Sequence, residues 1–147
     1  MEKPDRPAIP QAGVIPYRRS PSGLPEVLLV SSRSHGWIFP KGHIEPLVAA
    51  ADMGAMEAFE EAGVRGRVDY EPLGVWSYEK HGSVYEVEFF ALQVQEILDQ
   101  WPEQRRRRRR WVTLNKASNL VSVPELRELV RQLKGHLGAD GRLASAS

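Results

Sequence analysis

The chain has 147 residues, of which 41% are hydrophobic and 27% charged, and its formal net charge is +1. This composition is typical of one globular domain with its own core, and no apolar run approaches the roughly 20 residues that a membrane-spanning helix needs. The absence of cysteine excludes a disulfide framework and thiolate chemistry.

The charge is unevenly distributed along the chain. Six consecutive arginines occupy positions 105–110, and without them 14 basic residues face 19 acidic ones, a balance of −5. The first ten residues contain three prolines and lack the apolar stretch of a signal peptide. We therefore expect a flexible leader at 1–10, an acidic body with one basic patch, and a cytoplasmic location.

Short apolar segments alternate with turn residues at the start of the chain. Glu26–Ser31 is a nearly continuous apolar run, as in a strand that is covered on both faces. The cluster of Arg, Ser, Pro and Gly before it is typical of a turn. We expect a strand at 11–17, a turn at 18–25, a strand at 26–31 and a short apolar segment at 37–39.

The stretch 40–64 predicts an amphipathic helix with two unlike faces. Glu57, Glu60 and Glu61 are spaced i, i+3 and i+4, so on a helix they share an arc of about 100°. Gly63 after the last turn predicts a left-handed cap. A stripe of small residues runs along roughly the opposite side, where the helix can approach a sheet closely: Ala51, Ala55, Ala58 and Ala62.

The three carboxylates have no cation near them in the sequence. No Lys or Arg lies between positions 42 and 64. Like charges ~5 Å apart at an effective dielectric of ~20 repel by about 3 kcal/mol per pair. A hard divalent ion that works together with substrate phosphates would relieve this repulsion. The alternative interpretation is a solvated acidic helix face.

The second half of the chain predicts a hairpin and a closing helix. Two strand-like arms flank Lys80–Gly82, and an apolar stripe of leucines follows Pro124. We expect a weak strand at 65–70, hairpin arms at 73–79 and 83–95, a short strand at 111–114, a helix at 124–137 and a frayed tail at 138–147.

The stretch from Gly42 to Val64 resembles the Nudix box, G-x5-E-x7-R-E-U-x-E-E-x-G-U with U apolar. Seven of its nine fixed positions match with the spacing intact. Two depart: Val48 stands where the family has Glu, and Met56 where it has Arg. Segments around 26–40 and the arginine run resemble the diphosphoinositol polyphosphate and diadenosine polyphosphate hydrolase branch.

This resemblance implies an α/β fold, a Nudix-type α/β/α sandwich around a mixed sheet, with one domain at 11–137. It implies that Glu57, Glu60 and Glu61 bind Mg²⁺ or Mn²⁺ and belong to the catalytic set. The general base of the family is either a box carboxylate or one in a later loop, where Glu103 is the candidate; an exposed loop glutamate is the alternative. The family's arginine at position 56 would pair with the box carboxylates, and Met56 cannot.

Several polar residues are candidates for contacts with substrate phosphates. If the arginine run leads into a strand, its alternate side chains face opposite sides, and about half can share a cleft. The alternatives are polar strand ends for the early residues and a solvated loop for the run. The predicted set is Ser32, Arg33, Lys41, Gly42, His43, Arg107 and Arg109.

The leading hypothesis is a metal-dependent Nudix hydrolase that cleaves a phosphoanhydride bond in a dinucleoside polyphosphate, a diphosphoinositol polyphosphate or a related nucleoside diphosphate-linked compound. The first alternative changes the substrate to ADP-ribose, a nucleotide sugar or an oxidised nucleotide. The second is a catalytically impaired Nudix-fold protein that binds a nucleotide or RNA. We expect a small phosphorylated molecule as partner rather than a membrane or nucleic acid, and a monomer or homodimer.

Overall fold

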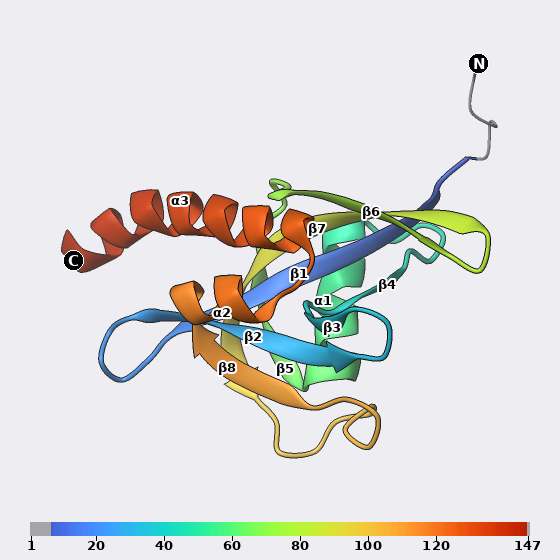
Figure 1. The fold of residues 1–147 in the computed structure, drawn as a ribbon. Coiled ribbons are helices and arrows are strands. Elements are labelled where there is room, and N and C mark those ends of the chain that lie inside the picture. The colour runs from blue at the N-terminus through green and yellow to red at the C-terminus, as the bar shows by residue number, and fades with distance from the viewer. Residues whose placement is uncertain (1–6, 147) are drawn as a thin grey trace.

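The structure is a computed structural model that describes residues 7–146, without the side chains of 139–146. It is an α/β sandwich, as the sequence predicts (Figure 1). Its elements in chain order are β1 (Ile9–Arg19), β2 (Pro25–Ser32), β3 (Gly36–Ile38), β4 (Lys41–His43), α1 (Ala50–Ala62), β5 (Val64–Val68), β6 (Gly74–Lys80), β7 (Ser83–Ile97), β8 (Arg109–Thr113), α2 (Leu114–Leu120) and α3 (Pro124–Ala146).

The eight strands form one mixed sheet. Its central path runs β3-β2-β1-β7-β5, while β4 pairs with β1, β6 with β7 and β8 with β2. The long strands β1 and β7 are parallel, and the other pairs are antiparallel. The predicted hairpin is confirmed as β6 and β7, which turn at Lys80–Ser83.

Helices cover both faces of the sheet (Figure 1). Three alanines of the α1 stripe, Ala51, Ala58 and Ala62, are buried at 2% exposure or less. A Cβ added to Gly54 would lie 2.8 Å from the backbone oxygen of Gly13, so the helix touches β1 almost backbone to backbone. This close packing fixes the position of α1, and so of its acidic face, relative to β1.

The opposite face is covered by α2 and α3 (Figure 1). The buried leucines of α3 pack into the same core as Trp76 of β6, which is 2% exposed. Trp76 is therefore a core residue. None of the described helices is long and apolar enough to cross a membrane.

Several boundaries differ from those that the sequence predicts. The elements β4 and α2 were not expected, because each is short and carries no clear periodicity. Strand β1 begins at Ile9, inside the expected leader, and the helical backbone of α3 continues to Ala146, through most of the expected frayed tail. The remaining parts of these two predictions, residues 1–6 and 147, lie outside the described residues.

Candidate functional site

The candidate site lies at the C-terminus of α1. Gly63 has φ 66° and ψ 37°, the left-handed cap that its position predicts, and its N–H donates to the carbonyl of Phe59. The next carbonyls of the helix would lack partners. Donors from the segment 98–109 supply them: Glu103 N to Glu60 O at 2.9 Å, Trp101 Nε1 to Glu61 O at 2.9 Å, Arg109 Nη1 to Ala62 O at 2.9 Å and Leu98 N to Gly63 O at 2.8 Å.

This capping has a consequence for chemistry. The backbone of Glu103 is fixed one hydrogen bond away from Glu60, so the loop carboxylate lies beside those of the helix. Glu57 reaches in the other direction, over β4: a Cβ on Gly42 would lie 2.3 Å from the Glu57 carboxyl carbon. A side chain at position 42 would push the Glu57 carboxylate out of this place, which gives the first glycine of the box a physical reason.

Glu61 is the most buried member of the cluster. Its exposure is 3%, and its Oε1 atom has no hydrogen-bond partner among the described residues. Burial raises the pKa of Glu61 to about 8, against the lowering effect of Arg107. Burial also raises the pKa of Glu57. A buried carboxylate with an unpaired oxygen is costly unless a cation satisfies it.

The donor chemistry fits a divalent ion, but the side chains are not yet converged. Glu57, Glu60 and Glu61 offer the oxygen ligands that Mg²⁺ and Mn²⁺ prefer, and the unpaired Glu61 Oε1 is ready to accept a cation. Among the described residues, no three His, Asp or Glu side chains have the mutual geometry of a metal site. In these rotamers one or two carboxylates would hold the ion, with water and substrate oxygens as further ligands, as is usual for Mg²⁺.

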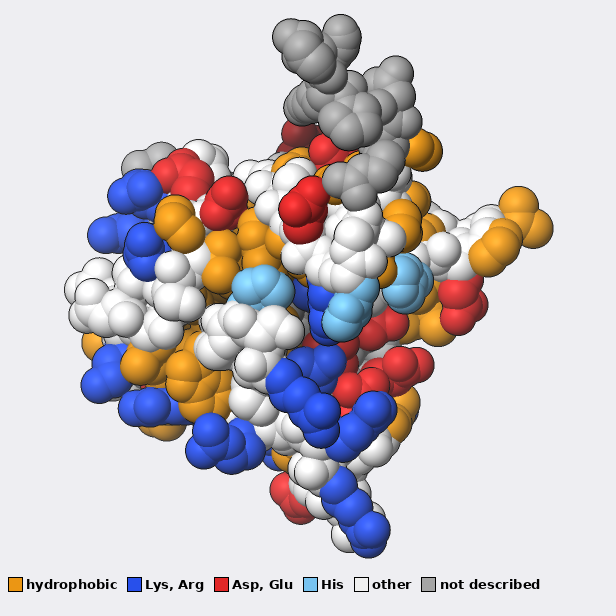
Figure 2. All heavy atoms as spheres, turned by 45° about the vertical axis from the view of Figure 1, so that its right-hand side comes forward, with side chains coloured by type: hydrophobic (Ala, Val, Ile, Leu, Met, Phe, Trp, Pro, Cys, Tyr) orange, Lys and Arg blue, Asp and Glu red, His pale blue; other side chains and the backbone are white. Residues whose placement is uncertain are grey.

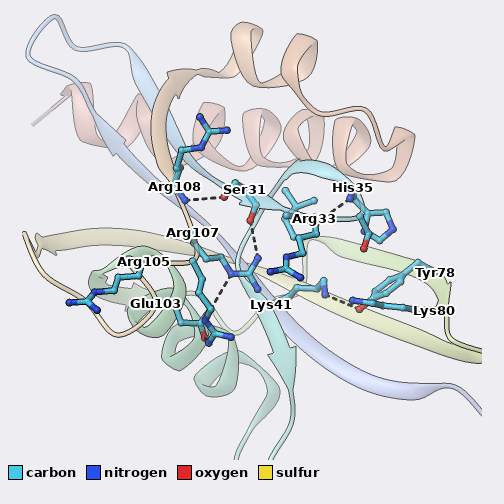
Figure 3. A pocket seen from close by; sticks show the side chains of 14 residues that line it. Ser31, Arg33, His35, Lys41, Tyr78, Lys80, Glu103, Arg105, Arg107 and Arg108 are labelled. Atoms are coloured by element: carbon cyan, nitrogen blue, oxygen red, sulfur yellow. Dashed lines mark hydrogen bonds and ion pairs between the residues drawn. The ribbon is translucent and has the colours of Figure 1, made fainter.

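Arg107 lies between the carboxylates of the helix and of the loop. Its Nε donates to Glu103 Oε1 at 3.1 Å, and its Nη2 is 3.6 Å from Glu61 Oε2. Its Nη1 donates to the backbone oxygen of Ser31, at the end of β2, at 2.9 Å. One guanidinium thus connects three elements of the fold (Figure 3).

A strongly cationic pocket of about 630 Å³ adjoins this cluster. Figure 2 shows Lys and Arg side chains gathered around a hollow, with acidic side chains beside it. Of fourteen lining residues, seven are Lys or Arg and one, Glu103, is acidic. The lining residues are Ser31, Ser32, Arg33, Ser34, His35, Ile38, Lys41, Tyr78, Lys80, Glu103, Arg105, Arg106, Arg107 and Arg108.

The floor of the pocket is ordered by a chain of polar contacts. Lys41 Nζ donates to the hydroxyl of Tyr78 at 2.8 Å (Figure 3). That hydroxyl donates to Oε1 of the buried Gln11 at 2.9 Å. Burial lowers the pKa of Lys41, while the Glu61 carboxylate raises it. The ammonium of Lys41 therefore lies between the pocket and the carboxylate cluster.

The structure brings together most of the predicted site residues. Ser32, Arg33, Lys41, Glu103 and Arg107 line the pocket. The helix carboxylates adjoin it through the Arg107–Glu61 ion pair, and Gly42 lies against Glu57.

Two predicted substrate ligands lie elsewhere. His43 is exposed and faces Tyr85, with ring centroids 5.9 Å apart, outside the residues that line the pocket. Arg109 is also absent from the lining: its guanidinium caps α1 and lies 3.9 Å from the centroid of the Trp101 ring. The cap and the stacking engage Arg109 in the fold, so its position gives no support to a substrate contact.

The arginine run departs from the predicted alternation. Strand β8 begins only at Arg109, and the preceding residues turn, with Arg106 N and Arg107 N both donating to Glu103 O at 2.9 Å. Four successive arginines, 105–108, therefore line the pocket where a strand would have sent half of them away. Sequence reasoning also missed His35, in the turn between β2 and β3, and Tyr78 and Lys80 of β6, which the sheet brings to the pocket from a distant part of the sequence.

Comparisons with known proteins agree with this architecture. Residues 8–133 match the family model described as the NUDIX domain. Nudix hydrolase 12, mitochondrial, of Arabidopsis thaliana is 39% identical over 130 residues, covering 74% of this chain and 64% of the relative. Diphosphoinositol polyphosphate phosphohydrolase 2 of Rattus norvegicus is 33% identical over 115 residues, covering 74% of this chain and 63% of the relative.

The fold is also found among solved structures. The crystal structure of the C. elegans Ap4A hydrolase superposes with a TM-score of 0.74 at 23% identity, covering 88% of this chain and 98% of that one. At that identity the likeness shows the fold alone. The chain spans less than two thirds of the length of the first curated relatives that it matches. The match over 8–133, together with these relatives, shows that the chain belongs to the Nudix family.

Proposed function

We propose that the chain is a metal-dependent hydrolase that cleaves a phosphoanhydride bond in a small molecule with several phosphates. The observation that carries this proposal is the composition of the pocket beside the helix carboxylates, which is lined by seven Lys and Arg side chains and only one carboxylate. Each guanidinium offers a planar fork for phosphate oxygens. A single diphosphate would leave most of these cations without a partner.

The carboxylate cluster supplies the other half of the reaction. Glu57, Glu60 and Glu61 would hold Mg²⁺ or Mn²⁺, which when bound neutralises phosphate oxygens and makes water more acidic. Glu57 is partly buried, and burial raises the pKa of its carboxyl, which makes its carboxylate a stronger proton acceptor. Glu103, fixed beside the cluster, is the second candidate for this base.

The proposed reaction uses a carboxylate base and the cations of the pocket beside the bound ion. A water molecule attacks one phosphorus of the anhydride, its proton passes to the carboxylate base, and the bond to the bridging oxygen breaks. The leaving phosphate gains negative charge as this bond breaks. Lys41 and the arginines of the pocket stabilise that charge, and hydrogen bonds hold the side chains of Lys41 and Arg107 in place before the reaction begins.

The aromatic side chains help to choose among polyphosphates. Tyr78 lines the pocket, but its ring is packed against Trp76 at 4.6 Å and Tyr85 at 5.2 Å between centroids. The Lys41 ammonium lies 4.7 Å from the centroid of the same ring. Little of Tyr78 is left for a nucleobase to stack on. We therefore favour a diphosphoinositol polyphosphate over a dinucleoside polyphosphate, in keeping with the name of the rat relative.

The test is phosphate release from a matched substrate panel with Mg²⁺ or Mn²⁺. The panel contains a diphosphoinositol polyphosphate, diadenosine polyphosphates of different length and ADP-ribose. We expect the highest kcat/KM for the diphosphoinositol compound and no turnover in EDTA. Equal kcat/KM for ADP-ribose would refute the polyphosphate assignment, while the enzyme assignment would stand.

Two departures from the box favour one second candidate, a Nudix-fold binding protein. Val48 and Met56 each replace a charged box residue, and no three of the described His, Asp or Glu side chains are grouped as metal ligands. Tight binding of the polyphosphate without release of phosphate, at any concentration of Mg²⁺ or Mn²⁺, would establish this candidate and overturn the enzyme.

A further inference from the structure

The guanidinium that pairs with the box carboxylate Glu61 comes from outside the box. The position of the signature arginine holds Met56, whose side chain is 43% exposed. Helix α1 contains no Lys or Arg at all. The guanidinium that reaches Glu61 belongs to Arg107, 46 positions later in the chain and on the loop that caps the helix.

The contacts of Arg107 restrict its position from three directions. The backbone oxygen of Ser31 belongs to the sheet, Glu103 to the loop and Glu61 to the helix, at 2.9, 3.1 and 3.6 Å from guanidinium nitrogens. The side chain is 26% exposed, so these contacts are partly shielded from water. Arg107 thereby differs from Arg105, Arg106 and Arg108, which are exposed.

In each of the carboxylates Glu61 and Glu103, the two oxygens have different surroundings. Glu61 turns Oε2 toward Arg107, while Oε1 is buried and has no partner among the described residues. Glu103 gives Oε1 to Arg107 and lies with Oε2 3.6 Å from Arg106. A partner that holds one oxygen of a carboxylate fixes the direction in which the other one points.

We propose that Arg107 is the positioning residue of the carboxylate cluster, filling from the loop the place that Met56 leaves empty on the helix. It orients Glu61 and Glu103, and so presents the free Glu61 oxygen to the divalent ion. This inference rests on the proposed metal-dependent function only for its kinetic readout. The alternative is that Arg107 occupies the place of the ion and competes with it.

Direct Mn²⁺ binding, measured by electron paramagnetic resonance or calorimetry without substrate, separates these two roles. If Arg107 orients the ligands, Arg107→Gln should weaken Mn²⁺ binding by roughly 10- to 100-fold, the range for residues that support metal ligands. If Arg107 competes with the ion, the same variant should bind Mn²⁺ more tightly. Unchanged or tighter binding overturns the proposal.

Two further variants remove the effects of charge and of folding. Arg110→Gln loses the same charge from an exposed position outside the pocket and should bind Mn²⁺ as the wild type does. Arg107→Lys keeps the charge but lacks the planar fork, and we expect it to melt near the wild-type temperature and to bind Mn²⁺ at least ~3-fold more weakly. Wild-type Mn²⁺ affinity in Arg107→Lys would contradict a positioning role.

Kinetics give an independent readout on the preferred substrate. We expect Arg107→Gln to lower kcat at saturating Mn²⁺ by at least ~10-fold with a smaller change in KM. The variant would misplace the reacting groups without weakening substrate binding to the same extent. A change confined to KM would make Arg107 a substrate ligand and overturn the proposal. If the wild type hydrolyses no member of the panel, the proposed function fails, while the Mn²⁺ measurements still decide the role of Arg107.

Discussion

At the scale of single residues, the site depends on one buried carboxylate and one distant arginine. Glu61 is 3% exposed with an unpaired oxygen, and Arg107 lies 3.6 Å from its other oxygen. The pattern of box carboxylates made Glu61 predictable from the sequence. The arginine that serves it was not predictable, because nothing in six identical neighbours distinguishes Arg107 from the rest.

The helix carboxylates should be indispensable for metal binding and dispensable for folding. Glu60→Gln and Glu61→Gln each keep the side-chain shape and leave the buried alanine stripe of α1 untouched. We expect each to lower hydrolysis by at least ~10²-fold, the scale of losing a positioned electrostatic group. Wild-type turnover in both variants, with circular dichroism confirming the fold, would show that the metal site lies elsewhere.

Restoring the signature arginine should change little. Because Arg107 already provides a cation to Glu61, Met56→Arg adds a second one from an exposed position. We expect Mn²⁺ affinity and kcat/KM to stay within ~3-fold of the wild type, since exposed ion pairs contribute about 0–1 kcal/mol. A tenfold rise in kcat/KM would mean that the wild-type carboxylates are poorly restrained.

The raised pKa of Glu61 predicts how the metal effect depends on pH. In the folded chain Glu61 holds its proton up to about pH 8, against an ordinary value of 4.5. Protonated Glu61 therefore makes its full contribution to the stability of the metal-free fold below pH 4.5. This contribution to stability is lost as pH rises through 8. The ion must displace that proton, so metal binding strengthens over the same range.

The corresponding measurement is the rise in Tm on adding saturating Mg²⁺, compared between pH 5.5 and pH 8. We expect a larger rise at pH 8, because tighter binding to the folded state stabilises it more. In Glu61→Gln the rise should be small at both values. An equal rise at both pH values in the wild type would show that Glu61 does not release a proton to the ion.

At the scale of elements, the C-terminus of α1 and the loop 98–108 form one structural unit. The loop, together with Arg109 at the start of β8, satisfies the carbonyls from Glu60 to Gly63, and Glu103 of the loop is thereby placed beside the helix carboxylates. The sequence predicted the helix, its apolar stripe and its Gly63 cap, because these follow from local periodicity and backbone preference.

The elements that escaped prediction lack such local signals. Helix α2 is only seven residues long and contains Asn and Ser, so its residues give little helical signal. Its one local signal is the N-cap, where the Thr113 side chain accepts a hydrogen bond from Lys116 N. A run of arginines has no periodicity, so it cannot show that 105–107 turn and that β8 starts at Arg109. Contacts across the sheet, such as Lys41 with Tyr78, depend on register and not on local pattern.

Arg109 tests the assignment of the loop contacts to folding. Arg109→Gln removes a hydrogen bond to the carbonyl of Ala62 and the stacking on Trp101. We expect the free energy of unfolding to fall by about 1–2 kcal/mol, as for a charged hydrogen bond, with KM unchanged. Arg108→Gln should do the reverse, raising KM with no loss of stability, because it is exposed and lines the pocket.

An increase in KM for Arg109→Gln at unchanged stability would restore the role that the sequence predicts for it. Urea unfolding and steady-state kinetics on the same preparations measure both quantities.

At the scale of the whole molecule, the charge asymmetry seen in the sequence becomes a spatial division. Six arginines are offset by a body with a balance of −5, and four of the six line one pocket together with Arg33, Lys41 and Lys80. Figure 2 shows this concentration on one face of the molecule. Such a field attracts polyanions and weakens as salt screens the exposed charges.

The most direct measurement of the central claim is the ratio of kcat/KM for the diphosphoinositol polyphosphate to that for ADP-ribose. We predict a high ratio for the wild type that decreases between 50 and 500 mM salt. In the triple variant Arg105→Gln, Arg106→Gln, Arg108→Gln this ratio should fall by at least ~10-fold, which corresponds roughly to the loss of one or more bidentate phosphate contacts. The ratio should not fall in Arg110→Gln. A ratio that neither salt nor the triple variant lowers would contradict selection of a polyphosphate by the arginine-lined pocket.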